Sequence, residues 1–488
     1  MLILTGTARR RISLKSDAVY FPTVILTPRT RNWFSIALAL VAGFALRGWL
    51  ITSFSQVAGD ALNYGDLAKN LVLHRTYGYS TVGGAVRPTL IRLPGYPLFL
   101  AACFRIFGVE HYTAVIRIQA FIDMASCILI AGTVRRWLGA RAGRAALWLA
   151  CLCPFTADYA AAPMTETLSI FCISLAFAAF ARLRDNPRSV GALIAFTFAV
   201  SYGALLRPDN VLLGVTVLPA LLYTLTQRKG LKTALAYTSA IALVAVIPFA
   251  IWAARNQRTF HVFQPLAPRY ANDVNEPAWL GFNRWVATWC VDFASTSEVY
   301  WVINDGRLDP AVLPDRAYDS PQQRTETLQL IKDYNTTTSL SPELDERFGN
   351  LAHQRAHSHP LRTYLLLPAA RLANMWLRPR TEMLPIDLRW WDYADDPGGT
   401  KFAAAYGALN ALYLLLALLG LVRALRKHAP AWLLVPLITF VALRCALLLT
   451  LETSEPRYTL ECFPMVFAFA AALFARFSAA PHAQPYAP

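Results

Sequence analysis

Long apolar runs alternate with short polar, mostly basic segments along most of this chain of 488 residues. Most runs are about 17–22 residues long, which is the length that an α-helix needs to cross the hydrocarbon core of a bilayer. Hydrocarbon offers backbone polar groups no water partners, so such runs must be helical. The pattern predicts an all-α polytopic membrane protein. We expect about ten transmembrane helices, at residues 33–54, 113–134, 145–160, 163–181, 190–206, 210–226, 233–254, 402–422, 431–450 and 463–480.

Two shorter apolar segments do not follow this pattern. Residues 93–107 contain two prolines and a glycine near their start, and residues 361–377 carry Arg362 and Arg371. We expect an interfacial or re-entrant helix at 93–107 and an interfacial helix at 361–377, with a transmembrane span as the alternative in each place. If the first segment does not span, the helix at 113–134 delivers the arginines that follow it to the cytoplasm, as the positive-inside rule requires.

The same rule orients the rest of the chain and places both termini in the cytoplasm. The longest polar segment then lies outside, between the seventh and eighth spans, and we expect it to be partly helical around 320–358. Loops of this length are usually functional. The predicted regions are a basic cytoplasmic N-terminus (1–32), a transmembrane catalytic module (33–254) with its external loop (55–112), a large external loop (255–400), C-terminal transmembrane helices (401–480) and a cytoplasmic tail (481–488).

Composition agrees with a membrane protein and argues against a soluble one. Hydrophobic residues make up 56% of the chain, and the mean hydropathy is +0.37. The net charge of +16 comes from basic residues at helix ends, so we do not read it as a nucleic-acid surface. Most of the eight cysteines fall in apolar runs, which does not indicate a disulfide framework.

Polar residues outside the predicted membrane come from six or more separate segments, which is how a site between helices is built. Asp60 stands about one helical turn past the exit of the first span. A carboxylate among arginines suits the transfer of a sugar from a lipid phosphate. The carboxylate serves as the general base for the acceptor, and arginines stabilise the departing phosphate. A glycosidase would instead need two paired carboxylates.

The order of the motifs resembles the GT-C superfamily of polytopic glycosyltransferases, which includes the protein O-mannosyltransferases and the lipid A aminoarabinose transferase group. The resemblance covers residues 35–255 and 430–480. The passages that carry it are Gly59-Asp60 with Tyr64 and Ala68, the run from Arg92 to Leu100, Arg117, and Glu455-Pro456-Arg457-Tyr458, with Pro163-Met164-Thr165-Glu166 and Leu206-Arg207-Pro208 in matching places.

This resemblance implies an inverting glycosyltransferase, hexosyl or pentosyl, that uses a polyprenyl-phosphate-linked sugar. Asp60 would be the catalytic base, and Arg117 and Arg457 would contact the donor phosphate. We add Arg92, Arg207, Tyr64, Tyr458 and Glu166 to the expected binding set. The acceptor would be a lipid, a glycan or a protein. The active site would lie on the periplasmic or lumenal side, and we expect a bacterial inner membrane.

Two departures from the family pattern leave the donor sugar and a divalent metal open. Ala61 follows Asp60 where the family often has Glu, and Arg92-Leu93 stands where a His or Lys is usual. We assign no cofactor and no metal-binding residue, since His353 and His357 lack the His-Glu-x-x-His pattern.

Other readings stay open from the sequence alone. A transporter or flippase of lipid-linked sugars would need charges through the membrane, for which Arg47, Asp123 and Arg444 are the candidates. A non-catalytic scaffold could use the long loop to bind a partner. Asp60 could also simply cap a helix.

Overall fold

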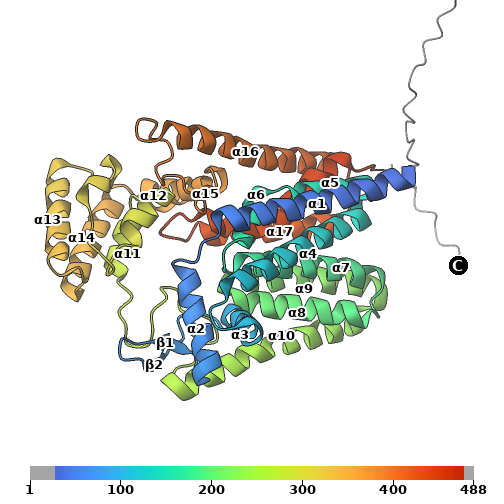
Figure 1. The fold of residues 1–488 in the computed structure, drawn as a ribbon, viewed down its shortest axis with the longest axis horizontal. Helices are drawn as coiled ribbons and strands as arrows, with labels where there is room; N and C mark the ends of the chain where they lie inside the picture. The colour runs from blue at the N-terminus through green and yellow to red at the C-terminus, as the bar shows by residue number, and fades with distance from the viewer. Residues whose placement is uncertain (1–27, 478–488) are drawn as a thin grey trace, which may run out of the picture.

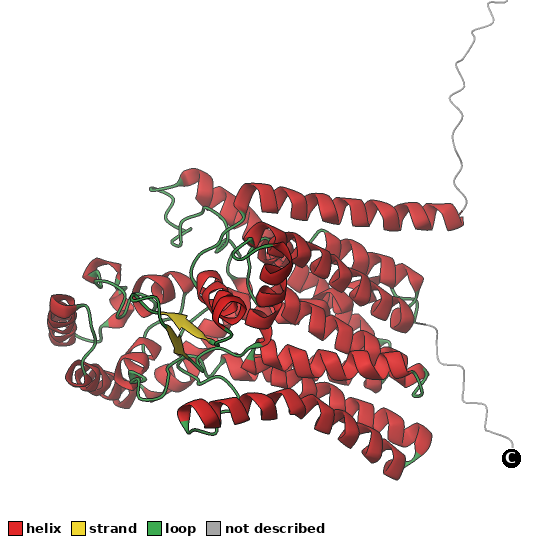
Figure 2. Ribbon diagram, turned by 60° about the horizontal axis from the view of Figure 1, so that its bottom comes forward, coloured by secondary structure: helices red, strands yellow, loops and turns green. Residues whose placement is uncertain are grey.

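The computed structural model describes residues 28–477, and it confirms an all-α architecture (Figures 1 and 2). Eight helical segments within these residues are long and apolar enough to cross a membrane. The predicted tail 481–488 and most of the predicted N-terminal region 1–32 fall outside the described residues. The eight segments are α1 (Pro28–Phe54), α4 (Tyr112–Leu138), α7 (Glu166–Asp185), η1 with α9 (Pro208–Lys229), α10 (Leu231–Phe260), α16 (Pro397–Arg426), α17 (Ala431–Leu448) and the helical run Pro456–Phe474, which includes α18 (Phe463–Ala471).

The other two predicted spans have a different form. Residues 190–206 form a shorter apolar helix, α8 (Val190–Leu206). The predicted span 145–160 is two helices, α5 (Ala140–Cys151) and α6 (Pro154–Ala160). The break falls before Pro154, whose ring clashes with the preceding turn and whose nitrogen has no hydrogen to donate.

The first external loop is compact. It contains α2 (Asp60–His74), a hairpin of β1 (Gly78–Ser80) and β2 (Val86–Pro88), and α3 (Gly95–Phe107). The two strands pair antiparallel, with Tyr79 opposite Arg87. Asp66 joins α2 to this hairpin, since its carboxylate accepts hydrogen bonds from the Ser80 amide (2.7 Å) and hydroxyl (2.6 Å).

The large polar segment folds into a small helical domain, here called the loop domain (residues 280–358). Its main helices are α11 (Leu280–Ala287), α13 (Pro321–Thr337) and α14 (Pro342–Ser358), with the short α12 (Phe293–Ser295) between them. They enclose an aromatic core that includes Trp285, Trp289 and Phe348. A π-helical turn (Arg362–Leu366) and α15 (Leu367–Leu377) lead back towards the bundle.

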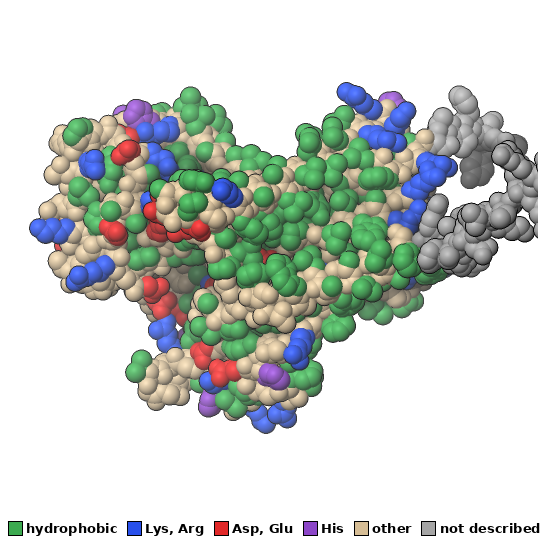
Figure 3. Space-filling model, turned by 45° about the horizontal axis from the view of Figure 1, so that its top comes forward, with side chains coloured by type: hydrophobic (Ala, Val, Ile, Leu, Met, Phe, Trp, Pro, Cys, Tyr) green, Lys and Arg blue, Asp and Glu red, His purple; other side chains and the backbone are tan. Residues whose placement is uncertain are grey.

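The bundle has two unlike ends. The loop domain and α2 lie at one end, and α1 begins at the other (Figure 1). In Figure 3 apolar side chains cover much of the visible bundle, and Lys and Arg gather at the end away from the loop domain. This distribution agrees with the predicted orientation, in which the basic end faces the cytoplasm.

The mid-bundle charges that a transporter would need are closed off by their own contacts. Arg47 and Asp123 are each 1% exposed. The Arg47 guanidinium donates to the Asp123 carboxylate, with Nε–Oδ2 2.8 Å, and to the carbonyls of Ala150 and Cys151 at the end of α5. This pair therefore ties α1, α4 and α5 together.

Gly95 allows α3 to approach the end of α8 closely. A Cβ built on Gly95 would lie 2.5 Å from the carbonyl oxygen of Leu205. The Tyr202 hydroxyl donates to the Gly95 carbonyl at 3.0 Å. The glycine of the Leu-Pro-Gly-Tyr-Pro passage thus fixes α3 next to the residues that lead into Arg207.

We expect Gly95→Ala to lower the free energy of unfolding by about 1–3 kcal/mol, because the backbone of α8 must shift to admit the methyl group. Thermal unfolding of the purified protein in detergent measures this change. Gly132→Ala is the matched control, because a Cβ there meets nothing within 4 Å. Equal melting temperatures for the two variants would contradict the packing argument.

Candidate active site

Asp60 is the first residue of α2 and lies between two arginines from distant parts of the chain. Its Oδ1 accepts a hydrogen bond from Arg92 (2.7 Å), and its Oδ2 accepts one from Arg457 (3.0 Å), which is 397 residues away. The N-cap of α2 is Gly59, with φ 54°, and it makes no side-chain cap hydrogen bond. The Asp60 carboxylate thus accepts hydrogen bonds from the two arginines and does not cap the helix.

This arrangement keeps Asp60 ionised. Burial alone raises the pKa of the Asp60 carboxyl, but the charges of Arg92 and Arg457 outweigh it and hold that pKa below its ordinary value. A carboxylate in this state is a weak base, because both of its oxygens already accept charge-assisted hydrogen bonds. Its basicity would rise if either arginine turned to another anion.

Arg207 forms the second centre of the site, between α8 and η1 (Pro208–Asn210). Its Nη1 donates to Glu166 Oε1 at 2.9 Å, and its Nε donates to Asp209 Oδ1 at 3.2 Å. Glu166 begins α7 and is completely buried. The same Glu166 Oε1 lies 4.0 Å from Nη1 of Arg457. Glu166 therefore joins the two arginine centres.

Two tyrosines flank the arginines. The Arg92 guanidinium lies over the ring of Tyr64, 5.7 Å from its centroid, and that of Arg207 lies over Tyr458 at 5.0 Å. The Tyr458 hydroxyl donates to Glu455 at 2.8 Å, and Glu455 also accepts from Arg457 Nε at 2.6 Å. These contacts hold the planar guanidinium groups in fixed orientations.

A cluster of buried charged residues lies next to Arg207, and the sequence analysis predicted only some of its members. Arg444 on α17 donates to Asp209 Oδ2 at 2.7 Å and lies 2.9 Å from Glu461 Oε2. Glu461 also lies 3.3 Å from Arg207 Nε, and its two contacts are ion pairs outside hydrogen-bonding geometry. Arg444 and Glu461 are both fully buried. The available signal was an acid just before an apolar run, four residues after Arg457.

A cavity of about 490 Å³ lies beside the site, and both polar and apolar side chains line it. Its polar lining includes Asp60, Arg92, Arg207, Arg457 and Tyr458. Its apolar wall comes mainly from α9 and α17, and it includes Leu206, Val211, Leu212, Leu447, Leu448 and Leu451. A segment of the long polar region, which includes Pro268 and Arg269, completes the lining.

The structure does not bring every predicted site residue into this cavity. Arg117 is exposed on α4 and lies outside the cavity lining, since the neighbouring Val115, Ile116 and Gln119 occupy the buried face of that helix. Glu166 lies behind the lining, where it contacts Arg207 and Arg457. Tyr64 is part of the lining.

The site's carboxylates lie beside arginines and do not form a metal cluster. Within residues 28–477, no group of three or more His, Cys, Asp or Glu side chains could hold a metal ion. His353 and His357 lie on one face of α14, with ring centroids 6.3 Å apart.

Residues 87–252 match the family described as dolichyl-phosphate-mannose-protein mannosyltransferase. That range begins in the external loop and ends in α10, and it contains Arg92, Glu166 and Arg207. No curated protein matches the chain.

Several solved structures resemble the chain weakly. ArnT from Cupriavidus metallidurans, bound to undecaprenyl phosphate, is 16% identical, with a TM-score of 0.37 over 92% of this chain and 77% of ArnT. The oligosaccharyltransferase AglB from Archaeoglobus fulgidus, in complex with an inhibitory peptide and a dolichol-phosphate, is 13% identical, with a TM-score of 0.44 over 91% of this chain and 50% of AglB.

The matched residues 87–252 contain the motifs at Arg92, Arg117, Glu166 and Arg207, whereas those at Asp60 and Arg457 lie outside them. The chain is an integral membrane protein by its apolar helices. The match confirms its resemblance to the membrane glycosyltransferases of the GT-C superfamily.

Proposed function

We propose that this protein transfers a sugar from a polyprenyl-phosphate-linked donor to an acceptor nucleophile, with inversion at the anomeric carbon. The observation that carries the proposal is the position of Asp60 between Arg92 and Arg457 in the lining of a cavity that also has apolar side chains. The charged part of this lining suits an anionic phosphate, and the apolar part suits the first units of an isoprenoid chain.

In this proposal, arginines stabilise the phosphate that leaves the sugar. When the bond between the anomeric carbon and the phosphate oxygen breaks, the oxygen keeps the electron pair and gains negative charge. Arg92, Arg207 and Arg457 all border the cavity and supply donors for that charge. Glu166, Glu455 and the two tyrosines act through these arginines, since they orient guanidinium groups. Arg117 lies outside the cavity lining, so we propose no direct role for it in the transfer.

In this proposal, Asp60 is the general base. In the reaction, the acceptor nucleophile attacks the anomeric carbon from the face opposite the phosphate, and its proton passes to an oxygen of Asp60. We propose that the donor phosphate takes over hydrogen bonds that Arg92 and Arg457 give to Asp60 in the free protein. The pKa of Asp60 then rises, so donor binding itself activates the base.

This exchange predicts two different pH dependences. We expect kcat/KM, which reports the free protein, to stay level down to about pH 4, because the arginines keep the pKa of Asp60 below its ordinary value. We expect kcat, which reports the donor complex, to fall at a higher pH, because Asp60 has then lost part of its arginine contacts. Steady-state rates from pH 3.5 to 8 measure both. Coincident acid limbs would contradict the exchange.

We place the site on the extracytoplasmic side of a bacterial inner membrane. The support is that α2, which begins at Asp60, lies at the end of the bundle away from the start of α1 (Figure 1), and that Arg207 and Arg457 line the same cavity as Asp60. The loop domain lies at the same end as the site, and Arg269 from the segment before it borders the cavity. The loop domain is thus well placed to select a lipid, glycan or protein acceptor.

The experiment is an incubation of the purified protein with a panel of polyprenyl-phosphate hexoses and pentoses in membranes that supply acceptors. Mass spectrometry follows both products, the glycosylated acceptor and the released polyprenyl phosphate. We expect one donor class to yield both in equal amounts. Donor movement across vesicles without release of polyprenyl phosphate would favour a flippase and contradict the proposal.

A further inference from the structure

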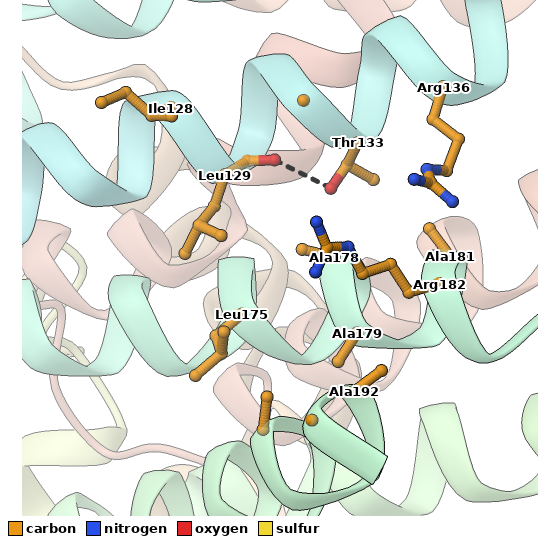
Figure 4. A pocket seen from close by; sticks show the side chains of 13 residues that line it. Ile128, Leu129, Thr133, Arg136, Leu175, Ala178, Ala179, Ala181, Arg182 and Ala192 are labelled. Atoms are coloured by element: carbon orange, nitrogen blue, oxygen red, sulfur yellow. Dashed lines mark hydrogen bonds between the residues drawn. The ribbon is translucent and has the colours of Figure 1, made fainter. Parts of the chain in front are cut away.

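A second cavity lies at the opposite, basic end of the bundle, between α4, α7 and α8. It is a groove of about 290 Å³, and Figure 4 shows the side chains that line it. Ile128 and Leu129 come from α4, Leu175 and Ala178 from α7, and Ala192 from α8. The groove belongs to none of the machinery around Asp60.

Small residues make the groove deep enough to hold a chain of methylene groups. A Cβ built on Gly132 of α4 or on Gly191 of α8 would meet nothing within 4 Å, so both positions face open space. The flanks are apolar and exposed, with Ile128 52% and Ile194 64% accessible. Such flanks on transmembrane helices face lipid.

Two arginines give the groove a charged end. Arg136 of α4 contacts Asp185 at 2.6 Å, and both side chains are partly exposed. The Arg182 guanidinium extends from α7 towards Thr133 across the groove (Figure 4), and among the described residues it has no hydrogen-bond or ion-pair partner. The Thr133 hydroxyl donates to the Leu129 carbonyl at 2.8 Å, which leaves its oxygen able to accept.

We propose that this groove binds an anionic phospholipid of the leaflet at the basic end of the bundle. One acyl chain lies along Gly132 and Ala178, and the lipid phosphate lies between Arg182 and Arg136. Charge complementarity selects the occupant, because basic pockets between transmembrane helices on the cytoplasmic side suit anionic headgroups. The apolar length of the groove favours a lipid over free phosphate. This inference is independent of the proposed sugar transfer.

The test is native mass spectrometry of the full-length protein in detergent, titrated with phosphatidylglycerol or phosphatidylcholine. We expect bound phosphatidylglycerol at concentrations at least about tenfold lower than phosphatidylcholine, one decade being 1.4 kcal/mol. Arg136→Gln with Arg182→Gln should remove this preference. Gly132→Leu should weaken the binding of both lipids, because an added Cβ meets nothing within 4 Å and the longer side chain takes up space in the groove.

Matched variants separate the groove from general effects. Arg426→Gln with Lys427→Gln removes two exposed charges from the same end of the bundle, and Gly48→Leu fills open space on α1. Both should bind phosphatidylglycerol as the unaltered protein does. Equal binding of the two lipids, loss of preference in the Arg426/Lys427 control, or displacement of phosphatidylglycerol by millimolar inorganic phosphate would overturn the proposal.

Discussion

Asp60→Asn is expected to lower the rate of sugar transfer by about 10²–10⁴-fold, the usual contribution of a general base. Asparagine has nearly the same shape as aspartate, but its amide cannot take the proton of the acceptor. Arg92 and Arg457 remain in place to bind the donor phosphate, so donor affinity should persist. Transfer from a labelled donor, measured together with donor binding, checks both expectations.

Asp66→Asn is the matched control. Asp66 lies on the same helix, but its carboxylate bonds Ser80 in the hairpin and does not border the cavity. We expect this variant to keep most of its transfer activity. Full transfer activity in Asp60→Asn, or an equal loss of activity in the two variants, would contradict the assignment of Asp60 as the base.

Arg444→Met is expected to lower the free energy of unfolding by about 3–5 kcal/mol, because it leaves buried charge without its partner. Glu461 is fully buried beside Arg444, and Asp209 accepts a hydrogen bond from the same guanidinium. Arg207 would remain as the only described cation near both carboxylates. Unfolding in detergent by heat or denaturant measures the change.

The double variant Arg444→Met with Glu461→Gln shows whether buried charge is the cause. We expect it to recover part of the lost stability, because the unpaired carboxylate is gone. If the free energy of unfolding of Arg444→Met lay within about 0.5 kcal/mol of that of the unaltered protein, the ion pairs of Arg444 would contribute little to stability, which contradicts the account. A double variant that is less stable by the sum of both single losses would also contradict the account.

Hydropathy predicted most helices of the bundle, and the charge order singled out Asp60, Arg92, Arg207 and Arg457, which line one cavity in the folded chain. The apolar runs became helices because their backbones need internal hydrogen bonds. Asp60 and Arg457 come together as expected, although neither motif alone indicates the other. Pro154 carried a signal for the broken helix α5–α6, but the apolar run around it suggested one continuous span.

The rest depends on helix rotation and packing, which apolar runs do not reveal. Arg117 has the type and order of a phosphate-binding residue, yet α4 turns it outward, because its apolar neighbours take the buried face. Glu461 was not predicted as part of the site, because the sequence does not show which cation an acid beside an apolar run will contact. Its partner Arg444 lies on another helix. The apolar cavity wall needs α9 and α17 side by side, which only the folded chain provides.

The most direct measurement of the central claim is a structure of the protein with bound polyprenyl phosphate. We predict its phosphate among Arg92, Arg207 and Arg457, with its isoprenoid chain along Leu447 and Leu448. At least one of the two arginine contacts to Asp60 should then be broken. A phosphate bound elsewhere, or one bound with both Asp60 contacts intact, would contradict the proposal that donor binding frees Asp60 from its arginines so that it can act as the base.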